Sequence, residues 1–189
     1  MPLLIFFALI VVVLVYFVMI YNNLVSLKHN IGRAWSNIDV LLKQRHDELP
    51  KLVETCKHYM QFEAETLEKI MLARGGVAQA REQRDMVALG AAEQQLRSRL
   101  GALYATVEAY PELRANMQFQ HLVGRITQLE NDIADRREFY NDTVNVNNVR
   151  IEQFPDVIVA NAFHFKPAQL LEFDSHDKQD VSVGTLFQR

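Results

Sequence analysis

The chain has 189 residues, a formal net charge of −3 and a single cysteine, Cys56. This charge gives no basic footprint for a nucleic-acid partner, and one cysteine excludes an internal disulfide. The length is enough for one domain with a real core in addition to a membrane segment, so a second domain is not required.

The first element is an apolar run over residues 3–20, without a charge or a helix breaker. At 1.5 Å per residue the run covers about 27 Å, close to the roughly 30 Å of a bilayer's hydrocarbon core. A cleaved signal peptide would begin with basic residues and end at a small-x-small site, and neither is present. We therefore expect an uncleaved membrane anchor over residues 1–21, with lipid-facing positions at Leu3, Phe7, Val11, Val15 and Ile20.

The basic residues that follow the run predict its orientation. Lys28 and Arg33 lie on its C-terminal side, and no Lys or Arg precedes it. Because Lys and Arg tend to remain on the cytoplasmic side, we expect a single-pass protein whose N-terminus faces out and whose body is cytoplasmic.

A long helix should follow directly. Apolar positions step by three and four from Ile31 to Tyr59, which is typical of a packed stripe on one helix. Pro50 lies inside this stripe and should kink or end the helix, but the phase continues across it. The pattern favours one kinked helix from the membrane to about Ala73, closed by the glycine pair at 75–76.

Two further helices complete the predicted fold, which is all-α. A second helix is expected over about 80–109, and a third begins at Pro111 and runs some forty residues to the Phe154–Pro155 pair. One or two further helical turns are expected over 156–162, before a tail over 163–189 that we expect to be the least ordered part. Short connections predict an elongated antiparallel bundle of three to four helices over residues 22–162.

The sequence offers little for catalysis. No two of the six histidines lie three to five residues apart, so no zinc pattern is present, and we expect no metal or cofactor. Cys56 falls on the apolar stripe, where a small buried side chain is favoured over a catalytic thiolate. The glycine pair joins helices instead of following a strand, so it does not predict a phosphate loop. We assign no catalytic residues.

Polar residues on the apolar stripes are more informative. Arg45 and Arg136 occupy stripe positions, and a buried arginine without a partner would cost several kcal/mol. We expect a polar layer that fixes helix register, with contact to a partner or ligand, or proton chemistry, as alternatives. The layer comprises Asp39, Arg45, Asp47, Arg136 and Asn141.

Five segments together resemble one known family. They are 21–25 (YNNLV), 34–40 (AWSNIDV), 45–54 (RHDELPKLVE), 108–116 (EAYPELRAN) and 136–141 (RREFYN), followed by Phe154–Pro155. In order and spacing they resemble the LemA family, from the anchor to about Lys166. The resemblance implies an N-terminal membrane helix and an antiparallel helical bundle in bacterial membranes, without established enzymatic activity. We expect the bacterial inner (cytoplasmic) membrane as the location.

The leading functional hypothesis is a non-enzymatic, membrane-anchored scaffold that forms homo-oligomers and organises or shapes the membrane. The alternative is an adaptor or regulator of a membrane enzyme such as a peptidase, with a membrane-protein partner. Its contact surface would be Phe163, Phe165 and Phe173. An enzyme is the least favoured class.

Overall fold

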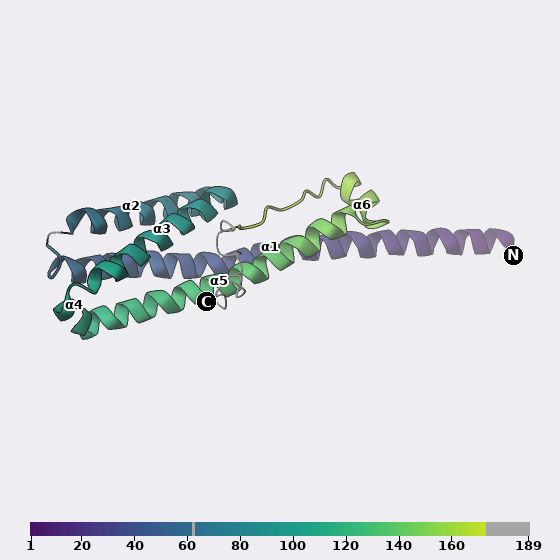
Figure 1. The fold of residues 1–189 in the computed structure, drawn as a ribbon. Coiled ribbons are helices and arrows are strands. Elements are labelled where there is room, and N and C mark those ends of the chain that lie inside the picture. Colours follow the sequence, from purple (N-terminus) through teal and green to yellow (C-terminus); the bar gives the residue numbers. More distant parts are fainter. Residues whose placement is uncertain (62, 173–189) are drawn as a thin grey trace, which may run out of the picture. The chain divides into compact units, whose positions relative to one another are not determined.

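The computed structural model describes residues 1–61 and 63–172, and every regular element in these ranges is an α-helix (Figure 1). The all-α prediction is confirmed. The helices are α1 (Pro2–Lys57), α2 (Ala64–Gln83), α3 (Met86–Val107), α4 (Pro111–Ala115), α5 (Met117–Glu152) and α6 (Asp156–Ala162).

The chain divides into two compact units. The N-terminal unit contains residues 1–45 and 125–170, and the central unit contains residues 46–124 with residues 171–172. Both α1 and α5 contribute to each unit, because the division falls within these two helices.

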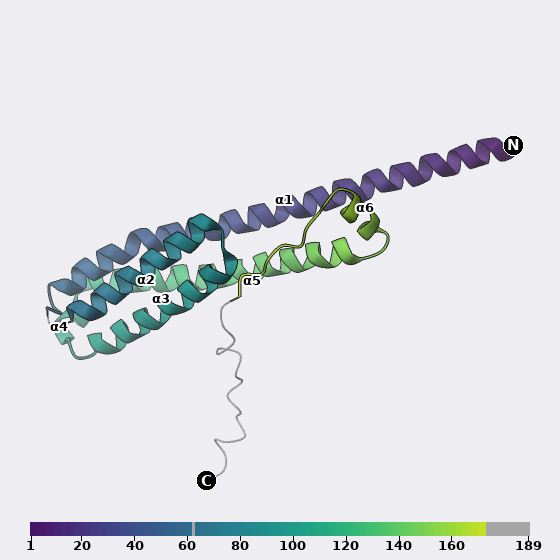
Figure 2. The same cartoon turned by 90° about the horizontal axis from the view of Figure 1, so that it is seen from above.

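In the N-terminal unit, α6 lies beside α1 and the end of α5 (Figure 2). Ile20 and Leu24 of α1 pack with Val159 and Ala160 of α6 and with Ile151 of α5, and all five are buried. All five side chains are apolar, and only Ala160 is small. The hydrophobic effect therefore holds the short α6 against the longer helices.

The same unit continues along α1 and α5. The ring of Trp35 meets that of Tyr140 edge-on, with centroids 6.2 Å apart, and both side chains are buried. Ile38 and Val144 are fully buried in the same stretch. These apolar positions at helical spacing on the two helices therefore form part of the core.

In the central unit, α2 and α3 lie side by side and are joined by a tight turn (Figure 2). Arg84 ends α2 in the left-handed conformation, with φ of 53°. Asp85 then starts α3, because its Oδ1 accepts a hydrogen bond from the backbone N–H of Ala88 at 2.9 Å. An aspartate before an apolar helix is an N-cap signal, and it puts the break here and not near residue 80.

The predicted end of the first helix is wrong. Helix α1 ends at Lys57, and α2 runs through Gly75 and Gly76. No described glycine has a positive φ, so the pair adopts ordinary helical geometry. Glycine permits a helix end but does not impose one. Packing of α2 through Ile70, Ala73 and Val77 outweighs the low helix propensity of the pair.

Pro50 does not end α1, although it removes the N–H that would donate to the carbonyl oxygen of His46 four residues earlier. In the central unit this oxygen instead accepts a hydrogen bond from Arg74 Nε of α2, at 2.8 Å. The guanidinium group thus replaces the missing backbone donor. The contact explains why an interior proline is tolerated here.

The later boundaries follow the sequence more closely. Pro111 begins a helix at its first position, as predicted, and α5 ends just before the Phe154–Pro155 pair. The expected forty-residue helix is interrupted at Asn116, whose backbone is extended and whose Oδ1 accepts a hydrogen bond from Phe119 N at 3.0 Å. Asn116 therefore caps α5 and separates it from α4.

The segment after α6 is held against α5. Asn148 Nδ2 donates to the Ala168 carbonyl oxygen and Asn148 Oδ1 accepts from Ala168 N, both at 2.9 Å. The hydroxyl group of Tyr140 donates to the Gln169 carbonyl oxygen at 2.9 Å. The start of the predicted tail is thus an ordered part of the N-terminal unit, while residues 173–189, with Phe173, lie outside the described residues.

Candidate membrane interface

The most unusual surface of the chain is the start of α1. Every side chain from residue 1 to residue 19 is exposed, on all sides of the helix. Leu3 is 80% exposed and Phe7 66%, and Val11 and Val15 are also open. Among the described helices, α1 has a segment long and apolar enough to cross a membrane. Water is a poor solvent for so large an apolar surface.

Ile20 departs from the predicted set of anchor positions. Its side chain is only 4% exposed, because it packs in the core formed with α5 and α6. Leu3, Phe7, Val11 and Val15 remain available to lipid, and their contact with a bilayer stays a prediction. The exposed apolar segment therefore ends at residue 19, one position before the folded body begins.

Aromatic rings surround this boundary. The ring of Tyr21 lies 4.7 Å from that of Phe163 and 6.0 Å from that of Phe165, measured between centroids. Phe165 is half-buried against the core, so much of its surface is already covered within the chain. Phe163 is 60% exposed. Of the predicted partner contacts, Phe163 is thus the more accessible of the two described residues.

The turn from α5 to α6 together with α6 and Phe163, residues 153–163, adds further exposed apolar residues, and we call it the α5–α6 corner. Phe154 in the connection is 81% exposed and Ile158 of α6 is 47% exposed. The carboxylate of Asp156 is buried and forms an ion pair with Arg150. This pair neutralises the buried charge next to the exposed Phe154 and Ile158.

The residues of the predicted polar layer differ in burial. Arg45 is buried, whereas Asp39 and Asn141 are half-buried. Asp47 and Arg136 are exposed. The position assigned to Arg136 is therefore wrong.

The buried stripe of α5 explains this error. It steps from Ile133 to Tyr140 through the half-buried Arg137, one position after Arg136. Steps of four then three, and of three then four, fit a helix equally well, so periodicity could not choose between the adjacent arginines. A register role for Asp39, Arg45 and Asn141 remains a prediction.

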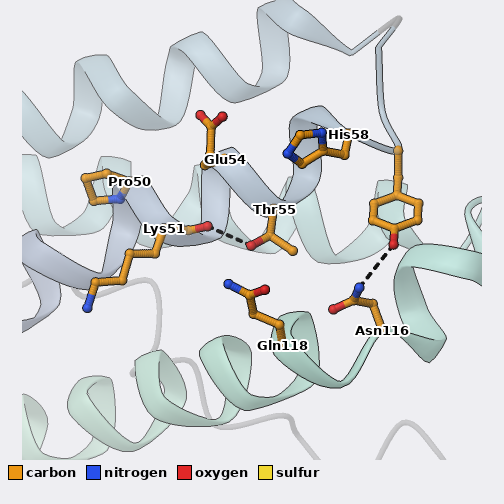
Figure 3. Close-up of a pocket in the computed structure, with 8 residues that line it drawn as sticks. Pro50, Lys51, Glu54, Thr55, His58, Asn116 and Gln118 are labelled. Atoms are coloured by element: carbon orange, nitrogen blue, oxygen red, sulfur yellow. Dashed lines mark hydrogen bonds between the residues drawn. The ribbon is translucent and has the colours of Figure 1, made fainter.

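A polar groove of about 700 Å³ lies in the central unit (Figure 3). The Thr55 hydroxyl donates to the Lys51 carbonyl oxygen at 2.9 Å, and Asn116 Nδ2 donates to the Tyr59 hydroxyl at 3.1 Å. The Thr55 proton is therefore directed at a backbone carbonyl oxygen and not at a side-chain base. The lining residues are Pro50, Lys51, Glu54, Thr55, His58, Tyr59, Asn116 and Gln118.

The Cys56 thiol and the His46 imidazole are two further groups that could react. Burial raises the pKa of the Cys56 thiol to about 12, so the thiol stays protonated at neutral pH. Burial, and then the charge of Arg74, lower the pKa of His46 below its ordinary value. Within residues 1–61 and 63–172, no three His, Cys, Asp or Glu side chains gather as a metal site would require.

Comparison with known proteins identifies the family of the all-helical body. The family model described as "LemA family" matches residues 34–184. The chain belongs to the LemA family. Residue 34 lies beyond the apolar segment, so the match concerns the helical body itself.

Relatives of this chain carry two kinds of name. Magnetosome proteins MamQ 1 and MamQ 2 of Paramagnetospirillum magneticum are each 25% identical to it over 191 residues, covering 89% of this chain and 70% of the relative. Protein LemA of Metamycoplasma hominis is 26% identical over 165 residues, covering 87% of this chain and 74% of the relative. The chain is thus a membrane-associated helical protein of the LemA family.

Proposed function

We propose that this member of the LemA family is a non-enzymatic scaffold anchored in a bacterial inner membrane by α1, and that it forms homo-oligomers that organise or shape the membrane. One observation carries the proposal. A full apolar helical segment, residues 2–19, is exposed on every side and continues without a break into the folded body. Such a helix satisfies its own backbone hydrogen bonds, as a bilayer requires.

Continuity between anchor and body supports a scaffold. Because α1 has no flexible linker between residue 19 and the core at Ile20, the direction of the span sets the direction of the N-terminal unit. Copies that share a membrane would then be presented in a common orientation. Exposed apolar side chains outside the anchor, such as Leu72 and Val87, offer surface for contact between copies.

Size in a lipid environment tests self-association. The full chain, reconstituted in nanodiscs, should give a defined oligomer by mass photometry. Photo-crosslinkers at Leu72 and at Val87 should yield crosslinks between copies, with the exposed Phe139 as a matched position for comparison. A strictly monomeric protein across the concentration range would contradict this part of the proposal.

Orientation can be tested separately. We propose that the N-terminus faces out, because Lys28 and Arg33 follow the span. In a Cys56→Ser background, Pro2→Cys should react with an impermeant maleimide in intact cells, and Ser36→Cys only after lysis. The opposite labelling pattern would reverse the topology without affecting the anchor.

The alternative function, an adaptor or regulator of a membrane enzyme such as a peptidase, is favoured by the exposure of Phe163. A photo-crosslinker at Phe163 in living cells should then capture a membrane protein of another sequence. Self-crosslinks alone at this position would favour the scaffold.

A further inference from the structure

The α5–α6 corner packs against α1 at the end of its apolar segment. Residues 2–19 are exposed, and the next residue, Ile20, is buried against Ile151, Val159 and Ala160. An 18-residue helical segment covers about 27 Å, which is nearly the full hydrocarbon core. If the segment spans the bilayer, Ile20 lies at its edge, and the core holds α6 at the same depth.

The large side chains of the corner that face away from this core are apolar, and the polar Gln153 and Asn161 are exposed beside them. Val159 and Ala160 are buried, whereas Ile158 is 47% exposed, Phe163 60% and Phe154 81%. In both views of the N-terminal unit, the connection from α5 to α6 lies further toward the N-terminal end of α1 than α6 itself (Figures 1 and 2). Phe154 is the central residue of this connection.

Charge in the corner is compatible with this depth. Asp156, the single acidic residue of α6, is buried and paired with Arg150. Exposed charges flank the α5–α6 corner in the sequence, with Glu152 before it and Lys166 after it. Apolar and aromatic residues bordered by polar groups are typical of the layer between acyl chains and headgroups.

We propose that the α5–α6 corner is a second membrane contact, in which Phe154, Ile158 and Phe163 enter the interfacial layer of the leaflet where α1 leaves the bilayer. The inference rests on the proposed membrane anchoring by α1. Continuity with the span favours lipid as the occupant over a second copy of the chain, because lipid is already present at this depth. The corner would limit the tilt of α1, since the N-terminal unit then touches the membrane at two points.

Tryptophan quenching in vesicles tests the contact with the full chain. Phe154→Trp and Phe139→Trp are compared with the unchanged protein in phosphatidylcholine–phosphatidylglycerol vesicles whose acyl chains carry bromine near the glycerol backbone. Phe139 is a matched control, since it is 56% exposed in the same unit but lies 13 residues before the end of α5. That separation is about 20 Å of helix.

We expect Phe154→Trp to show blue-shifted emission and strong quenching by the brominated lipid. Phe139→Trp should be quenched no more than the buried Trp35 of the unchanged protein. Circular dichroism melting of both variants checks that the fold is retained, and exposed positions make both substitutions mild.

Each other outcome has a separate meaning. Unquenched Phe154→Trp in protein that resists carbonate extraction would overturn the second contact and leave the anchor intact. Protection of the same tryptophan by a neighbouring copy, seen as crosslinking at position 154 without quenching, would also overturn it. Protein released by carbonate would overturn both the anchor and the corner contact.

Discussion

Two stretches of the same helix behave in opposite ways. Residues 2–19 of α1 are exposed on all sides, whereas residues 46–57 bury a stripe that includes Leu49, Leu52 and Cys56. The first stretch contains no interior proline and satisfies its own backbone, but the second contains Pro50 and borrows a donor from Arg74. A helix that packs against protein can lose a backbone hydrogen bond, because a neighbouring side chain can supply the missing donor. Lipid chains have no such donor.

We expect the greatest loss of membrane insertion when charged residues are introduced into residues 2–19. Replacing Val11, Val12 and Val13 with aspartate should cost about 8–10 kcal/mol of insertion free energy, at about 2.5–3.5 kcal/mol for each residue near the centre of a span. We expect the variant to leave the membrane fraction after carbonate extraction.

The matched control changes three exposed valines outside the segment, Val40, Val87 and Val146, to aspartate. This variant should stay in the membrane fraction, because the substituted positions lie outside residues 2–19. Equal behaviour of the two triple variants would show that residues 2–19 do not hold the protein in the membrane.

The second stretch is tested through its repaired hydrogen bond. Arg74→Met should lower the free energy of unfolding by about 1–3 kcal/mol, because the His46 carbonyl oxygen loses its donor. In a Pro50→Ala background the new N–H can bond to that oxygen, so the same substitution should cost clearly less. Urea unfolding in detergent measures both values. Equal costs in the two backgrounds would contradict the repair.

Gly75 distinguishes an interior helix position from a helix end. Because α2 runs through Gly75 with negative φ and an added Cβ would meet nothing within 4 Å, Gly75→Ala should stabilise the protein by about 1 kcal/mol. The sign is the test. A destabilising Gly75→Ala would support the helix end that the glycine pair suggests from sequence alone, since alanine is unfavourable at positive φ.

The smallest effect near neutral pH concerns Cys56. Its folded-state pKa of about 12 exceeds the ordinary value of 9.0, so the unfolded chain loses the proton first. Stability should be unchanged below pH 9 and fall by about 1.4 kcal/mol per pH unit between pH 9 and 12, relative to Cys56→Ala. Urea unfolding across this range measures the difference. A constant difference between the two proteins would show that the thiol is not shielded.

Sequence alone was enough to predict the all-α class, the LemA resemblance, the apolar segment and the helix boundaries at Pro111 and before Phe154–Pro155. These features depend on local chemistry: uninterrupted apolar residues, helical spacing and the restrictions that proline places on its neighbours. Asp85 and Asn116 are also residue types that favour the start of a helix. Apolar periodicity alone did not identify these two helix starts.

Tertiary structure decided the rest. It ended α1 at Lys57 where no breaker stands, carried α2 through two glycines, and placed Arg137 on the buried side where the sequence had suggested Arg136. It also drew Ile20 from the apolar segment into the core against α6, and supplied Arg74 to the carbonyl group that Pro50 leaves open. Each of these outcomes depends on atoms far apart in the chain. Periodicity and propensity describe one helix at a time and cannot contain that information.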